Sequence, residues 1–147
     1  MMAEDFTAYA VIAHIGFDRP LSPQTIQQNV GELMSRIALD CVGEGARLIG
    51  HIKCLAETLE GGAIICSVTT EDGRATSSGR VPSSSDLLDV ILNVLVYGLS
   101  DDRIEEIVER DIPLVFPRAT FELEGFHHDH EHEGHDHSFV QFEEGQR

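Results

Sequence analysis

The residues from His127 to His137 form the densest group of potential metal ligands in the chain. This His-rich segment, HHDHEHEGHDH, holds six of the eight histidines, with four carboxylates between them. Imidazole is the commonest side-chain ligand of transition metals, and the neutral ring binds with little deprotonation cost near pH 7. Neighbouring carboxylates can bind the ion or accept the second ring N–H, which orients the imidazole. The predicted metal ligands are His127, His128, Asp129, His130, Glu131, His132, Glu133, His135, Asp136 and His137.

The ligand types narrow the choice of metal. No Cys or Met lies within the His-rich segment, which disfavours Cu(I), a soft ion that prefers sulfur. Imidazole with carboxylate suits Zn, Ni, Co or Cu(II), and the higher affinity of copper in vitro does not identify the physiological metal. We predict a divalent transition metal, Ni, Co or Zn, as the bound ion.

The spacing of these residues does not favour a catalytic metal site. An HExxH motif starting at His130 would need a second histidine at position 134, where the chain has Gly134. HEHEGH (His130–His135) approaches the HxHxDH motif of metallo-β-lactamase-like hydrolases, but Gly134 replaces the Asp. A catalytic site also needs a rigid scaffold with an open coordination position. The segment therefore predicts metal capture, storage or delivery, and a solvated loop without function is the alternative.

The residues after the histidines leave the form of this segment open. SFVQFEEG (Ser138–Gly145) contains Phe139, Val140 and Phe142, which are apolar enough to return to a sheet. The His-rich segment is then a loop between two short strands. A disordered end after Phe126 is the alternative, because chain termini often fray.

The overall charge excludes several partners. The formal net charge is −16, and no Lys or Arg lies between Glu122 and Glu144. Nucleic acids and anionic membrane surfaces attract basic proteins, so neither is expected as a partner. An acidic surface attracts cations instead.

The cysteines and the apolar segments indicate a cytoplasmic protein. Cys41, Cys54 and Cys66 are an odd number without CxxC spacing, which is typical of reduced thiols. The acidic N-terminus MMAEDF does not resemble a signal peptide. The run Leu87–Leu99 has 13 residues, whereas a membrane span needs roughly 20, so it is expected to be a buried helix.

The order of apolar and polar residues predicts one α+β domain, residues 1–126, followed by the metal-binding loop or tail 127–147. Ser22 and Pro23 are typical of a helix N-terminus, and Gly43 and Gly45 of its end. The expected order is β (7–17), α (23–41), β (46–59), β (62–73), α (86–97), a short helix from Ser100 that ends before Pro113, and β (119–126). This βαββαβ order predicts a ferredoxin-like fold, an antiparallel sheet with two long helices on one face.

Three groups in the body of the domain could carry chemistry. Cys54 and Cys66 face each other if their hairpin turns at Glu60, which allows a thiol pair or simply two small buried side chains. His51 and Lys53 lie on one side of their strand, opposite Cys54. His14 lies within an apolar strand and is expected to be a hydrogen-bonded core residue.

Two features resemble known metal-handling proteins. The His-rich segment is similar to those of nickel, cobalt and zinc metallochaperones, including hydrogenase and urease accessory proteins and CobW-type GTPases. LIGHIKCLAE (Leu48–Glu57) also resembles a strand in C-terminal domains of some CobW-type proteins. The chain contains neither GxxxxGK[ST] nor a CxCC motif, so the resemblance implies a stand-alone accessory domain without GTPase activity.

We therefore predict a metal-binding accessory protein that captures Ni, Co or Zn for delivery or buffering, with a recipient metalloprotein or a GTPase as partner. The alternative is a small-ligand-binding or oligomerising module, for example a homodimer, with the histidines as a sensor or store. An enzyme that uses His51, Lys53 and Cys54 is the third hypothesis.

Overall fold

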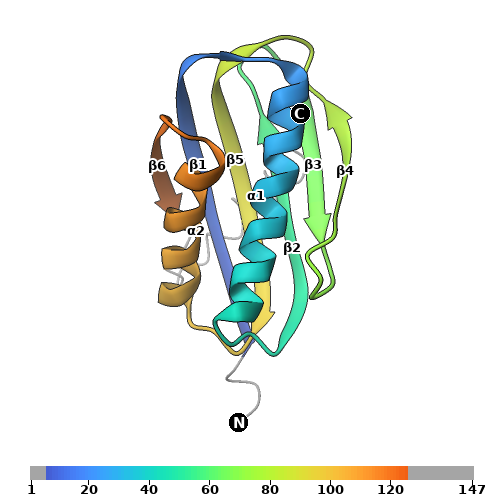
Figure 1. Cartoon of the computed structure of the whole chain (residues 1–147), viewed down its shortest axis with the longest axis vertical. Coiled ribbons are helices and arrows are strands. Elements are labelled where there is room, and N and C mark those ends of the chain that lie inside the picture. Colours follow the sequence, from blue (N-terminus) through green and yellow to red (C-terminus); the bar gives the residue numbers. More distant parts are fainter. Residues whose placement is uncertain (1–5, 126–147) are drawn as a thin grey trace, which may run out of the picture.

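One six-stranded antiparallel sheet and two helices make up the protein in the computed structural model, which describes residues 6–125 (Figure 1). The sheet order is β4-β3-β2-β5-β1-β6. The elements are β1 (Phe6–Leu21), α1 (Pro23–Gly43), β2 (Leu48–Glu57), β3 (Ala63–Val68), β4 (Ala75–Arg80), β5 (Ser85–Tyr97), α2 (Asp101–Val115) and β6 (Thr120–Gly125).

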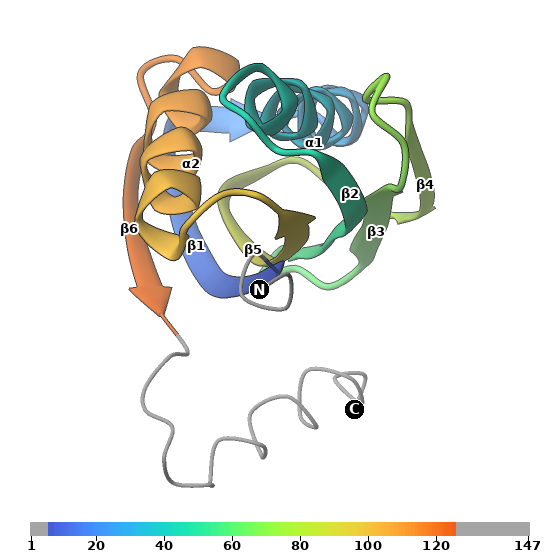
Figure 2. The ribbon, with the colours of Figure 1, turned by 90° about the horizontal axis from the view of Figure 1, so that it is seen from below.

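Both helices lie on the same face of a curved sheet (Figure 2). Alternate residues of the central strands point to this face and are buried, such as Val11, Ala13 and Ile15 of β1. They pack against the apolar side of α1, which includes Val30, Leu33 and Ile37. The predicted antiparallel sheet with its helices on one face is thus confirmed. Neither helix within residues 6–125 is long and apolar enough to cross a membrane.

The second long helix was predicted in the wrong place. Residues 86–97, expected to be helical, belong to β5, which pairs with β1 on one side and β2 on the other. Its buried residues alternate, as Leu88, Val90 and Leu92 show. On its second face, Ile91 and Leu95 are also apolar, and they obscured the alternation.

The helix after Ser100 is the second long helix. Ser100 is its N-cap and Asp101 and Asp102 occupy its first turn, where acidic residues favour a helix start. The helix does not end before Pro113, as predicted, but continues to Val115. Pro113 lies near the C-terminal end, so it interrupts little of the hydrogen-bond ladder.

Strand β4 was also not predicted, and together with β5 it gives the sheet six strands instead of four. Residues 75–80, ATSSGR, lie at the sheet edge and are largely exposed, so they carry no alternation of apolar residues to predict a strand. The strand count and order differ from the four-stranded ferredoxin-like sheet that was expected.

The two ends of α1 and the register between β2 and β3 agree with the prediction. The Ser22 hydroxyl accepts a hydrogen bond from the Thr25 amide, and Pro23 opens the helix. Gly45 (φ 118°) follows its end, in a region of backbone conformation that favours glycine. In the β2–β3 hairpin Cys54 lies directly opposite Cys66, as expected.

Candidate functional site

A row of polar side chains crosses the helix-free face of the sheet. The register places Glu57 of β2 beside Asp89 of β5, Asp89 beside His14 of β1, and His14 beside Glu122 of β6. Their strand neighbours Ala56, Leu88, Ala13 and Phe121 face the helix side. We call these four residues the His14 row.

His14 is bound by carboxylates on both ring nitrogens. Nδ1 lies 2.8 Å from Asp89 Oδ1, and Nε2 lies 2.8 Å from Glu124 Oε1. The hydrogen bonds to Glu124 and Asp89 raise the pKa of His14, although partial burial opposes them. The ring is therefore favoured as an imidazolium that donates to both carboxylates. Its side chain is 41% exposed, so the prediction of a core histidine is wrong, because residue 14 falls on the outer face of β1.

A hollow of about 440 Å³ lies at this row. Glu57, Asp89, His14 and Glu122 line it together with the apolar side chains of Leu59 and Leu87. Leu59 is 79% exposed and Leu87 47% exposed. The hollow thus combines carboxylates with an apolar rim.

The electrostatics of the His14 row favour cations. It has three carboxylates and one imidazole, and Glu57 and Glu122 form no ion pair with any residue of the described part. Nevertheless, residues 6–125 contain no group of three or more His, Cys, Asp or Glu side chains arranged to hold a metal ion. Both nitrogens of His14 are already engaged. The row can attract a cation, and other donors are needed to coordinate one.

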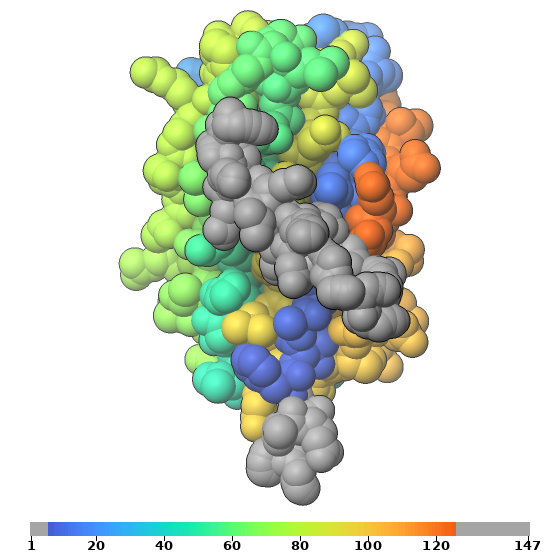
Figure 3. Space-filling view, turned by 180° about the vertical axis from the view of Figure 1, so that it is seen from behind, coloured from blue at the N-terminus to red at the C-terminus, as the bar shows by residue number. Residues whose placement is uncertain are grey.

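The ten predicted metal ligands, His127 to His137, lie outside the described residues. The described chain ends at Gly125, which pairs with Val11 and directly follows Glu124, the partner of His14. The His-rich segment is therefore joined by a single residue, Phe126, to the end of β6, beside the His14 row. Figure 3 shows the helix-free face and the edge formed by β6.

The three residues of the enzyme hypothesis do not come together. His51 and Lys53 face the helix-free side of β2, while Cys54 is buried on the helix side. Burial and the charge of Lys53 lower the pKa of His51. Because the sheet separates the thiol from the imidazole and the amine, these residues cannot form one catalytic site.

The cysteine pair is present but protected. Burial raises the pKa of both Cys54 and Cys66, and it raises the pKa of Cys41 to about 12. The thiolate is the reactive and metal-binding form, so these thiols are expected to be inert near neutral pH. The arrangement favours small buried side chains over a redox or soft-metal pair.

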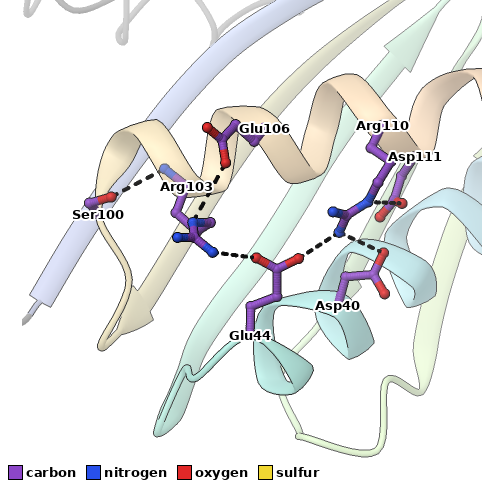
Figure 4. A network of polar contacts seen from close by, with 7 residues as sticks. All are labelled: Asp40, Glu44, Ser100, Arg103, Glu106, Arg110 and Asp111. Atoms are coloured by element: carbon purple, nitrogen blue, oxygen red, sulfur yellow. Dashed lines mark hydrogen bonds and ion pairs between the residues drawn. The ribbon is translucent and has the colours of Figure 1, made fainter.

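A second polar cluster joins the two helices (Figure 4). Glu44, the C-cap residue of α1, accepts hydrogen bonds from Arg110 (2.8 Å) and Arg103 (3.0 Å) of α2, and these arginines lower its pKa. Asp111 is fully buried, and neither of its oxygens has a hydrogen-bond partner among residues 6–125. Its burial and then the neighbouring Asp40 carboxylate raise the pKa of Asp111 to about 7. These contacts join the two helices.

Comparisons with known proteins add no family to this description. No protein-family model, no curated protein and no solved structure matches the chain.

Sequence reasoning missed the His14 row because its members come from four strands that are distant in the sequence. Only the correct placement of β5 brings Asp89 between Glu57 and His14. One signal was present in the sequence. Because His14 lies between the apolar residues Ala13 and Ile15, it had to point to the opposite face of the strand from them, but the sequence did not show which face is solvated.

Proposed function

We propose that this protein captures a divalent transition metal ion, Ni, Co or Zn, through its His-rich segment and holds it for delivery or buffering. The observation that carries the proposal is the sequence after β6, where six imidazoles and four carboxylates occupy ten of eleven consecutive positions. A tetrahedral zinc site needs only four ligands. The surplus allows several ligand sets to exchange, which favours moderate affinity and rapid release.

The His14 row supports this function as an electrostatic neighbour. The row lies next to the end of β6, from which the His-rich segment continues. The carboxylates Glu57 and Glu122 attract cations to this face of a chain with a net charge of −16. Charged surfaces of one sign raise the local concentration of the opposite ion. The row is thus expected to raise the rate of metal capture more than the affinity.

The partner that we propose is a recipient metalloprotein or a GTPase, as the resemblance to CobW-type accessory domains implies. The topology is compatible with this kinship. β2, β5, β1 and β6 are consecutive neighbours in the sheet, and with the two helices they follow a βαββαβ order if the hairpin β3–β4 is an insertion. We propose that the domain is a ferredoxin-like core enlarged by this hairpin.

The hollow beside the His14 row favours a second candidate function, binding of a small ligand. Its volume of about 440 Å³ falls within the size range of small-molecule sites. Carboxylates inside an apolar rim suit a cationic ligand with an apolar part. In this case the His-rich segment is a sensor or a store for metal.

Histidine substitutions test the metal proposal. Replacing any one of His128, His130 and His132 by Ala should weaken zinc binding less than about threefold, because other imidazoles take its place. Replacing all three should weaken binding at least about tenfold, which corresponds to 1.4 kcal/mol. Calorimetric titration with ZnCl₂ measures both, and the matched control is the double variant His14→Gln/His51→Gln, which should bind normally. A single substitution that abolishes binding would instead show a pre-organised site and favour catalysis.

A further inference from the structure

The helix-free face carries an apolar row immediately next to the His14 row. The register joins Ile12 of β1 to Ile91 of β5, Ile91 to Leu55 of β2, and Leu55 to Ile65 of β3. No helix between residues 6 and 125 covers this side of the sheet (Figure 2). Ile65 is 49% exposed, and the other three side chains are half-buried. Four adjoining aliphatic side chains on a solvated sheet face indicate a docking surface.

The chain leaves the described domain at one end of this apolar row. Ile12, the first member, pairs with Glu124, and the next residue, Gly125, is the last of β6. A chain that turns across the sheet from Gly125 would run along the row from β1 towards β3.

The length and composition of residues 126–147 fit this surface. Phe139, Val140 and Phe142 are three apolar residues within four positions. Phe139 follows Gly125 by fourteen positions, a reach of up to roughly 46 Å when extended. The apolar row spans three strand spacings, roughly 14 Å. The segment can therefore reach any part of the row.

Charge favours the same placement. Lys53, the single lysine of the chain, lies two residues from Leu55 on the same face of β2. It has no ion pair within the described part of the chain. Glu143 and Glu144 directly follow Phe142, so docking of Phe142 on the row brings two carboxylates within reach of this amine.

We propose that residues Ser138–Phe142 dock on the apolar row Ile12, Ile91, Leu55 and Ile65 of the same chain. Docking anchors the His-rich segment at both ends, at β6 and at the apolar row. The metal-binding residues then form a closed loop held close to the His14 row. This inference deepens the proposed metal function and specifies where the metal is held.

Nuclear Overhauser effects (NOEs) in the full-length, metal-free protein test the docking directly. With the Ile and Leu methyl groups labelled, we expect NOEs from the rings of Phe139 and Phe142 to methyls of the apolar row. The control is the triple variant Phe139→Ser/Val140→Ser/Phe142→Ser, which retains every predicted metal ligand. It should lose these NOEs and shift the methyl signals of Ile65 and Ile91, whereas those of the core residues Ile37 and Ile104 stay in place.

Two outcomes would overturn the proposal. In one, the NOEs are absent and the Ile65 and Ile91 signals do not respond to the triple substitution. In the other, mixing labelled and unlabelled chains shows that the NOEs arise between two molecules, so that a second copy covers the face. Because the experiment uses no metal, its failure leaves the zinc titration of the histidine variants as a separate test of the metal function.

Discussion

His14 shows how one position on a strand decides the state of an ionisable group. Its raised pKa comes from two exposed carboxylates, Asp89 and Glu124. The pKa of an unperturbed histidine, as in the unfolded chain, is about 6.5. A histidine whose pKa is higher in the folded protein stabilises the fold, and this stabilisation is complete at pH values below about 6.5. It is lost as pH rises through the folded-state pKa. Exposed pairs contribute less than about 1 kcal/mol.

We expect His14→Gln to lower the free energy of unfolding at pH 5.5 and to have little effect at pH 9, because only the imidazolium gains from the carboxylates. Urea unfolding at the two pH values measures this. His51→Gln is the control, for which we expect the opposite sign. Because the pKa of His51 is lowered in the folded protein, replacing it should raise the free energy of unfolding at pH 5.5. An equal effect of His14→Gln at both pH values would show that the ring contributes by packing alone.

Asp111 also makes the stability of the fold decrease as pH rises, but in a lower pH range than His14. Its pKa is raised to about 7, so the folded protein holds a proton that the unfolded chain releases from about pH 4 upward. The stability of the fold should therefore fall as pH rises between about 4 and 7. Asp111→Asn removes this penalty, and its free energy of unfolding relative to the native chain should increase by about 2–3 kcal/mol from pH 5 to pH 8. Thermal or urea unfolding that shows a pH-independent difference would mean that Asp111 is ionised throughout.

Among the elements, those with one clear periodicity could be predicted and those without it could not. The helix after Ser22 carries a cap and apolar residues at helical spacing, and it is confirmed as α1. β5 carries Leu87, Ile91 and Leu95 on its second face as well, so its period of two was hidden, and only its content of Val and Ile favoured a strand. β4 is polar on both faces. It forms a strand because it pairs with β3, and its own residue pattern does not reveal this pairing.

Gly79 tests whether β4 is a built part of the sheet. It has φ +84°, and a Cβ atom there would collide with the carbonyl oxygen of Ala63 on β3. Gly79→Ala should destabilise the protein by about 2 kcal/mol. Gly31→Ala in α1 is the matched control, because a Cβ there meets nothing within 4 Å, and it should stabilise by about 0.5–1 kcal/mol. Equal effects of the two substitutions in denaturant unfolding would contradict the pairing of β4 with β3.

The His-rich segment could be predicted from the sequence, whereas the two rows on the helix-free face could be found only from the fold. The ten predicted ligands could be named because they are nearly contiguous, and their composition predicts metal binding; this stays a prediction. The His14 row and the apolar row were not visible, because each is assembled across four strands. The fold brings both rows to one face of the sheet, next to the end of β6, after which the His-rich segment follows in the sequence.

The most direct test of the account is equilibrium dialysis of the intact chain and of a chain truncated after Phe126, each against zinc, nickel and cobalt at pH 7.5. The truncated chain retains every described element, so its circular dichroism spectrum should report the same fold. We predict that the intact chain binds metal with micromolar or tighter affinity and that truncation removes this binding, because all ten predicted ligands follow Phe126. Binding of equal affinity by the truncated chain would contradict the account and place the metal site in the domain.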